Sequence, residues 1–308
     1  MSDIILKTEN ISKTYGSQRV LDNVSLTVNK GDIYGFIGEN GAGKTTVIRV
    51  VTGLTKPDSG SYELFGVKNT DSNALNKAKA KLSAIVESPS IYSNFTALDN
   101  VLLNQSILGK RDVNKAQELL KLVGLEDVMT NKKAGNFSLG MRQRLGIAMC
   151  LANDPEFLIL DEPLNGLDPA GIVEVRELIL RLNQEKNITF MVSSHILTEL
   201  NLIANRYGII SHGKMVNEVT KDEIDLAIKK HTRIKTSDNE KALLIIKEHL
   251  TNNEIKVLGE EIVIVGEYNV TELVTLLAEE SISILNINTK EASIEDFYLH
   301  TLGGKENA

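Results

Sequence analysis

The sequence of 308 residues has little cysteine and no long apolar run, and each absence excludes a class of protein. Its single cysteine, Cys150, cannot form an intrachain disulfide, which fits a reducing compartment, and we expect it to be a small buried residue on a helix. No stretch approaches the roughly 18 to 20 apolar residues that cross a bilayer. The first ten residues, MSDIILKTEN, lack the basic and apolar regions of a secretion signal. We therefore expect a soluble, cytoplasmic protein whose membrane role, where it has one, depends on a partner.

Basic residues are not in excess either. The formal net charge of -7 argues against a nonspecific nucleic-acid binder, whose affinity depends on Lys and Arg side chains that neutralise phosphates. Apolar residues make up 42% of the chain and charged residues 24%, which is typical of a globular protein rather than a disordered one. Since domains average about 150 residues, the length predicts two of them.

The most specific motif is GENGAGKT at residues 38–45, which lies between an apolar run and an amphipathic stretch. This order predicts a strand, a glycine-rich loop and a helix. Gly38, Gly41 and Gly43 allow positive φ angles and turn backbone N–H groups toward one point, as a phosphate cradle requires. Lys44 can reach the β- and γ-phosphates, and the Thr45 hydroxyl can ligate Mg²⁺. An ordinary strand-to-helix turn is the alternative, but the flanking elements favour the cradle.

The spacing of apolar residues divides the rest of the chain. From about 97 to 151 they recur at intervals of three and four, which predicts a helical insertion without strands. Strands and helices then alternate from 157 to 210, which predicts parallel strands joined by helical crossovers. After residue 219 the order is strand, helix, strand, strand, helix, strand and a closing helix. That order matches a ferredoxin-like layout.

A second motif, FLILDE at residues 157–162, is acidic: an apolar strand that ends in two carboxylates. The carboxyl ends of parallel strands form the edge where α/β sheets bind ligands. Asp161 would hold Mg²⁺ through water, and Glu162 would polarise the attacking water. The alternative interpretation is two solvated acids at the end of a strand. The presence of the glycine-rich loop in the same chain makes this alternative the weaker one.

Three further motifs complete the set: FSLGMRQR at 137–144, NGLD at 165–168 and SSH at 193–195. In this order the motifs resemble the ATP-binding cassette (ABC) ATPase family over residues 1 to about 220. The resemblance implies an α/β P-loop NTPase fold with a mixed sheet core. It implies an ABC ATP-binding domain at 1–220, with a helical subdomain at about 88–152. The residue pattern after 219 predicts an accessory α+β domain at 221–308.

The resemblance also implies roles for single residues. Two copies of the chain would face each other head to tail, and Ser138 and Gly140 of one copy would cap the γ-phosphate bound by the other. His195 would contact that phosphate, and Tyr15 would stack on adenine; a packed histidine and a buried strand tyrosine are the alternatives. The residues assigned to ATP are Tyr15, Gly38, Asn40, Gly41, Gly43, Lys44, Thr45, Thr46, Ser138 and Gly140; those assigned to Mg²⁺ are Thr45, Glu87 and Asp161; those assigned to catalysis are Glu162 and His195.

The sequence departs from the family pattern at two motifs. Leu139 and Met141 replace a glycine and a glutamine of the common signature, and Glu87, in VESPSIY at 86–92, replaces the glutamine that usually reaches Mg²⁺. A carboxylate binds Mg²⁺ more strongly than an amide, but it adds negative charge beside the γ-phosphate, so the two effects oppose each other. With the ASIED tail at 292–296, these features resemble the ATPases of bacitracin-resistance and lantibiotic-immunity exporters.

The leading hypothesis is therefore an ATPase subunit that powers a separate membrane permease and moves an antimicrobial peptide. It would lie on the inner face of the membrane through that permease and would need no nucleic acid. The alternative is a soluble cassette ATPase that acts on ribosomes or DNA. One set of motifs, no sustained heptad repeat and the acidic charge argue against it. A kinase with the same cradle would have no use for the Ser138 motif.

Overall fold

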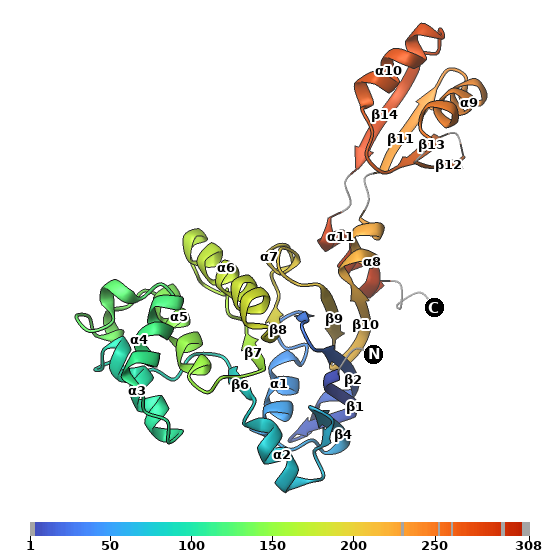
Figure 1. Ribbon diagram of the computed structural model, residues 1–308. Coiled ribbons are helices and arrows are strands. Elements are labelled where there is room, and N and C mark those ends of the chain that lie inside the picture. The colour runs from blue at the N-terminus through green and yellow to red at the C-terminus, as the bar shows by residue number, and fades with distance from the viewer. Residues whose placement is uncertain (1–3, 229–230, 252, 260, 291–292, 304–308) are drawn as a thin grey trace. The chain divides into compact units, whose positions relative to one another are not determined.

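A computed structural model describes residues 4–228, 231–251, 253–259, 261–290 and 293–303. Contacts within the chain divide it into two compact units, Met1–Lys221 and Asp222–Ala308, which are described separately (Figure 1). Within the described residues, no helix has both the length and the apolar character that crossing a membrane needs. Ala292, the first residue of the ASIED tail, lies outside the described residues.

A six-stranded sheet in the order β10-β9-β3-β8-β7-β6 forms the centre of the first unit. Five of its strands pair in parallel, as the alternation of strands and helices predicted, and β10 is antiparallel at one edge. Every residue of β3, β7 and β8 is buried, because both faces of a parallel sheet are covered. The bounds are β3 Ile33–Ile37, β6 Leu82–Ile85, β7 Phe157–Asp161, β8 Thr189–Ser194, β9 Arg206–Ser211 and β10 Lys214–Thr220.

A second sheet, in the order β2-β1-β4-β5, is antiparallel and shares a hydrophobic core with the first. Helix α1 contributes Val47, Ile48 and Val51 to this core, where they join Leu26 of β2 and Phe157 of β7. The helix that follows the glycine-rich loop is thus fixed between two sheets. The bounds are β1 Ile4–Tyr15, β2 Gln18–Asn29, α1 Lys44–Thr52, β4 Ser59–Leu64, β5 Val67–Lys68, α2 Ser72–Lys79, α6 Pro169–Lys186 and α7 Leu197–Asn201.

A buried polar contact ties the two sheets together. The Tyr34 hydroxyl of β3 donates to Glu218 Oε1 of β10 at 2.8 Å, and the same oxygen accepts from the backbone N–H of Thr27 in β2 at 3.1 Å. Burial, together with the Glu218 charge, raises the pKa of Tyr34 well above its usual range, so the phenol stays a donor. A Cβ at Gly208 would lie 2.0 Å from the Tyr34 hydroxyl oxygen, so this position has room only for glycine.

Residues 97–151 are helical, as their apolar spacing predicted, and contain no strand longer than a single bridge residue. Helix α3 begins at a capping box, in which Thr96 Oγ1 accepts from the Asp99 N–H and the Asp99 carboxylate accepts from the Thr96 N–H. The bounds are α3 Ala97–Ile107, α4 Val113–Leu122, η1 Glu126–Val128, η2 Ala134–Asn136 and α5 Leu139–Leu151.

The second unit contains a four-stranded antiparallel sheet in the order β12-β13-β11-β14. Helices α9 and α10 pack on this sheet through a core that includes Ile234, Ile246, Ile264 and Leu277. The chain thus runs strand, helix, strand, strand, helix, strand, in the order that its sequence pattern predicted. The bounds are α8 Lys221–Ala227, β11 His231–Thr236, α9 Asn239–His249, β12 Glu254–Leu258, β13 Glu261–Val265, α10 Val270–Glu279, β14 Ile284–Lys290 and α11 Ile294–Gly303.

Candidate nucleotide-binding site

The glycine-rich loop joins the end of β3 to the start of α1. Gly41 and Gly43 have φ angles of 84° and 112°, which side chains other than glycine rarely adopt. A Cβ at Gly38 would lie 2.5 Å from the carbonyl oxygen of Ile210 in β9, so the loop backbone packs directly on the sheet. Gly43 is the N-cap of α1 and provides no side-chain hydrogen bond. The first N–H groups of the helix are therefore left for an anion.

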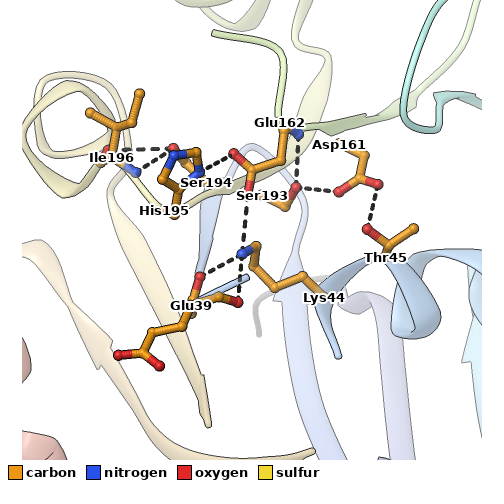
Figure 2. Close-up of polar contacts among 10 residues, drawn as sticks. Glu39, Lys44, Thr45, Asp161, Glu162, Ser193, Ser194, His195 and Ile196 are labelled. Atoms are coloured by element: carbon orange, nitrogen blue, oxygen red, sulfur yellow. Dashed lines mark hydrogen bonds and ion pairs between the residues drawn. The ribbon is translucent and has the colours of Figure 1, made fainter. Parts of the chain in front are cut away.

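Lys44 extends from α1 across this loop (Figure 2). Its ammonium group donates to the carbonyl oxygens of Gly38 at 2.5 Å and Glu39 at 3.2 Å. It also lies 3.1 Å from Glu162 Oε1, and only 6% of the Lys44 side chain is exposed. The lysine charge is thus held at the centre of the loop.

Thr45 and Asp161 meet beside the lysine (Figure 2). Thr45 Oγ1 donates to Asp161 Oδ2 at 2.8 Å, and Ser193 Oγ donates to Asp161 Oδ1 at 2.6 Å. The motif alone did not assign Ser193, although it belongs to the SSH sequence at 193–195. A hydroxyl and a carboxylate side by side are the hard oxygen donors that Mg²⁺ prefers, so these two residues fit that ion.

Glu162 joins Lys44 to His195. Its second carboxylate oxygen lies 2.8 Å from His195 Nδ1, and its backbone N–H donates to Ser193 Oγ at 2.9 Å. Glu162 has a φ of 50°, in the left-handed region that is uncommon for side chains other than glycine and is enriched at functional sites. Figure 2 shows the three side chains converging on one point from the ends of different elements.

Parallel topology explains this convergence. Strands β3, β8 and β7 are neighbours in the sheet, and their carboxyl ends lie at the same edge. The loop before Lys44 follows β3, Glu162 follows β7 and His195 follows β8. Motifs that lie more than a hundred residues apart in the sequence therefore meet at one edge, which is where such sheets bind ligands.

Tyr15 ends β1, and its side chain is 43% exposed, so the alternative of a buried strand tyrosine is wrong. It pairs with Gln18 across the turn into β2, and Leu21 of β2 packs close to Gly43. Lys13 Nζ lies 5.6 Å from the centre of the tyrosine ring. The Lys13 ammonium group thus lies over one face of a ring that is otherwise partly exposed. The loop residue Asn40 is exposed and Thr46 is buried in α1.

Glu87, which was also assigned to Mg²⁺, forms an ion pair with Arg49. Its carboxylate accepts from Arg49 Nη2 at 2.5 Å, and 62% of its side chain is exposed. Its φ of 64° is also in the left-handed region. Arg49 lies on α1, one turn after Thr45, and no sequence motif indicated a role for it.

The signature residues belong to the helical part of the unit. Ser138 is the N-cap of α5, and its Oγ accepts from the Met141 N–H at 3.2 Å. Ser138 is exposed, whereas Gly140 is buried, and a Cβ there would lie 3.6 Å from the Cα of Gly171 in α6. Figure 1 shows α5 and α1 on separate parts of the unit. Within one chain, Ser138 and Gly140 are thus separated in space from the glycine-rich loop at 38–45 (the Lys44 loop).

Comparison with known proteins adds an independent finding. The family model described as "ABC transporter" matches residues 21–165. The chain is 43% identical to the bacitracin transport ATP-binding protein BcrA of Bacillus licheniformis, over 97% of this chain and 98% of that protein. It is 42% identical to the lantibiotic transport ATP-binding protein SrtF of Streptococcus pyogenes, over 70% of this chain and 90% of that protein.

Solved structures agree in fold. The dimeric, post-hydrolysis structure of an ATP-binding cassette bound to ADP and Pi is 28% identical, with a TM-score of 0.63, and the match covers 70% of this chain and 98% of that one. A nucleotide-free cassette from an ABC transporter is 27% identical, with a TM-score of 0.64, over 73% of this chain and 95% of that one.

Proposed function

Because the chain belongs to the ABC transporter ATP-binding proteins, we propose that it hydrolyses ATP to power a separate permease that exports an antimicrobial peptide such as bacitracin or a lantibiotic. The single observation that carries the catalytic part is the cluster of Lys44, Glu162 and His195 at the sheet edge. The substrate class is supported by the likeness to BcrA, which extends over nearly the whole chain and therefore includes the second unit.

The loop and α1 would bind the triphosphate. The N–H groups at the start of α1, including those of Thr45 and Thr46, would contact the phosphates with the backbone of Asn40 and Gly41, and Lys44 would exchange its carbonyl partners for phosphate oxygens. Tyr15 would stack on adenine through its exposed face. Thr45 and Asp161 would hold Mg²⁺, which when bound neutralises charge on the phosphate oxygens. Ser193 would keep Asp161 oriented for this.

Glu162 would act as the general base on the attacking water. Two groups bind its carboxylate, Lys44 on one oxygen and His195 on the other. When the phosphates draw Lys44 away, that oxygen becomes free to accept a proton from water. His195 keeps the carboxylate aimed toward the phosphates and would itself contact the γ-phosphate.

A second copy of the chain would complete the site. Ser138 and Gly140 lie at the start of α5, a helix of 13 residues whose N-terminus favours anions. Ser138 and Gly140 lie apart from the Lys44 loop of their own chain. The γ-phosphate that they cap would therefore be bound by the Lys44 loop of a partner copy. The dimeric cassette to which the chain is similar supports this arrangement.

A groove on the first unit suits the permease. It has a volume of about 570 Å³ and runs between β6, the loop that follows it, α3 and α5. Leu54, Tyr92 and Ile107 line it and are 68%, 54% and 74% exposed, and exposed apolar side chains that gather on one surface mark interaction sites. The groove wall also includes Val86, next to Glu87, so a permease segment seated there would be linked to the ATP site. The ATPase would then work at the cytoplasmic face of the membrane.

We further propose that the second unit is ferredoxin-like. Its strand order β12-β13-β11-β14 corresponds to 2-3-1-4 in the order of the chain, all neighbours are antiparallel, and the two helices follow the first and third of these strands. Those are the features of the split βαβ layout.

Two measurements test the proposed function. Deleting the gene from its source strain should raise sensitivity to bacitracin or to a lantibiotic, and only a copy with intact Lys44 should restore resistance, since Lys44→Ala removes the charge at the centre of the loop. Unchanged sensitivity to both peptides would overturn the substrate class. The purified chain should bind ATP, and an equal affinity of Lys44→Ala in calorimetry would overturn the assignment of the loop.

A further inference from the structure

An ion pair links α1 to the loop that carries Glu87. Arg49 Nη2 lies 2.5 Å from Glu87 Oε1, across 38 positions of sequence. Arg49 and Thr45 are four residues apart on α1, so both side chains leave the same face of the helix. The pair therefore lies one helical turn from the contact between Thr45 and Asp161.

The sheet brings Glu87 to this position. Strand β6 pairs in parallel with β7, and Ile85 is opposite Leu160. The residues after β6 consequently leave the sheet at the same edge as Asp161 and Glu162. Glu87 thus lies at the edge that carries the acidic residues of the site, but its carboxylate is turned to α1.

The backbone at Glu87 is also unusual. Its φ of 64° is uncommon for residues other than glycine. Such a conformation persists where the surroundings hold it, and it is enriched at functional sites and switch regions. The contact with Arg49 is the ion pair that holds the side chain of this residue.

We propose that Arg49 is a positioning residue, which holds Glu87 on α1 and offsets its negative charge beside the bound triphosphate. This proposal rests on the assignment of the Lys44 loop to ATP. A carboxylate near phosphate oxygens repels them, whereas a guanidinium group carries a permanent positive charge and orients a carboxylate in one geometry. With Arg49 in place, the Arg49–Glu87 pair has no net charge. The glutamate of the loop then does not repel the phosphates of the nucleotide.

The proposal makes the effect of Arg49 depend on Glu87. In Arg49→Gln the Glu87 carboxylate is no longer held on α1 and is free to turn toward the phosphates, so binding of a non-hydrolysable ATP analogue with Mg²⁺ should weaken about fivefold, the scale of a partly exposed ion pair. In a chain that already carries Glu87→Gln, the same Arg49 change should alter binding less than about twofold. Arg49→Lys, which keeps the charge, should retain most of the affinity.

Calorimetry on the full chain tests this with the wild type, the three single variants Arg49→Gln, Arg49→Lys and Glu87→Gln, and the double variant of Arg49→Gln with Glu87→Gln. Lys115→Gln is the matched control, because it removes one positive charge from a comparable exposed pair with Asp154 at the amino end of the sheet. The control should bind the analogue as the wild type does, and thermal unfolding should show each variant folded, as the 40% exposure of Arg49 leads us to expect.

Two results would overturn the role of Arg49. The first is an equal loss of affinity in the presence and absence of Glu87→Gln, which would mean a merely structural effect. The second is no loss, or tighter binding, in Arg49→Gln. Failure of the wild-type chain to bind the analogue is a different outcome, since it would refute the assignment of the Lys44 loop and with it the proposed function.

Discussion

Replacing Glu162 with glutamine tests whether Lys44, Glu162 and His195 act as one charged cluster. Glutamine keeps the shape of the side chain and an oxygen that accepts from Lys44, but it removes the negative charge 3.1 Å from the ammonium group. The remaining partners of Lys44 are two backbone carbonyl oxygens, and the side chain is only 6% exposed. The lysine charge would then be buried beside dipoles alone, which costs free energy.

The size of the effect follows from these contacts. Loss of a surface ion pair costs about 0–1 kcal/mol and breaking a buried one about 3–5 kcal/mol. The Lys44–Glu162 pair is partly buried and glutamine retains a dipole there, so we expect the free energy of unfolding to fall by about 1–2 kcal/mol without nucleotide. For a unit of this size, that lowers the Tm by roughly 2–8 °C. The phosphates of ATP supply the charge that was removed. ATP should therefore raise the Tm of Glu162→Gln by more than it raises the Tm of the wild type.

Thermal unfolding with and without ATP and Mg²⁺ measures both quantities, and a phosphate-release assay measures turnover. Turnover should fall about 100- to 10,000-fold, which is the usual contribution of a general base. His195→Gln is the matched control, because it removes the other partner of Glu162 and leaves the lysine pair in place. An unchanged Tm together with an unchanged response to ATP would refute the charged cluster, and normal phosphate release would refute the role of Glu162 as the base.

Three further experiments probe the surroundings of the site. Gly38→Ala should weaken ATP binding in calorimetry and cost about 1–3 kcal/mol in urea unfolding, because the new Cβ would lie 2.5 Å from the Ile210 carbonyl oxygen; wild-type behaviour would contradict the close packing of the loop. Cys150 lies on α5 and is half-buried rather than fully buried as expected, and desolvation raises the pKa of its thiol from 9.0 to about 12, so iodoacetamide at pH 8 should modify the folded chain more slowly than the chain in urea. For the same reason stability should decrease above pH 9, where the unfolded thiol ionises first, and equal alkylation rates would disprove the shift. Asn100→Ala should cost about 2–4 kcal/mol in urea unfolding, since the buried amide bonds both the N–H and the carbonyl of Tyr92 in the groove wall; a loss below 1 kcal/mol would show that the wall does not depend on it.

Burial explains which elements the sequence predicted. Strands β3 and β7 lie inside the six-stranded sheet, and their continuous apolar runs marked them almost to the residue. The two strands of that sheet that were not predicted, β6 and β10, are its edges. Only Ile85 of β6 and Val219 of β10 are buried, so neither strand carries a clear apolar pattern. The apolar pattern that predicts a strand was thus weak at the edges of the sheet, where fewer residues are buried.

The site also has a part that the sequence predicted and a part that it did not. Contiguous motifs identified the residues of the loop and the acidic strand end, because the chemistry of a cradle is local. The partners of these residues were not predictable, since they depend on how strand ends meet in space. The sequence pattern alone did not indicate that Ser193 would bind both Asp161 and the Glu162 backbone, or that Arg49 would hold Glu87. All three contacts cross more than 30 positions of the chain.

The separation of the signature from the Lys44 loop has a physical reason. Asp161 ends a strand of the six-stranded sheet, and Lys44, Glu162 and His195 come after strands of the same sheet, so a single chain brings them together. Ser138 begins a helix of the inserted helical part, and its hydroxyl already caps that helix through the Met141 N–H. It is exposed and therefore able to serve a neighbouring molecule. In the proposed function, a site divided in this way would be complete only when two chains meet, and a contact that forms only around nucleotide would allow ATP binding and release to close and open a dimer.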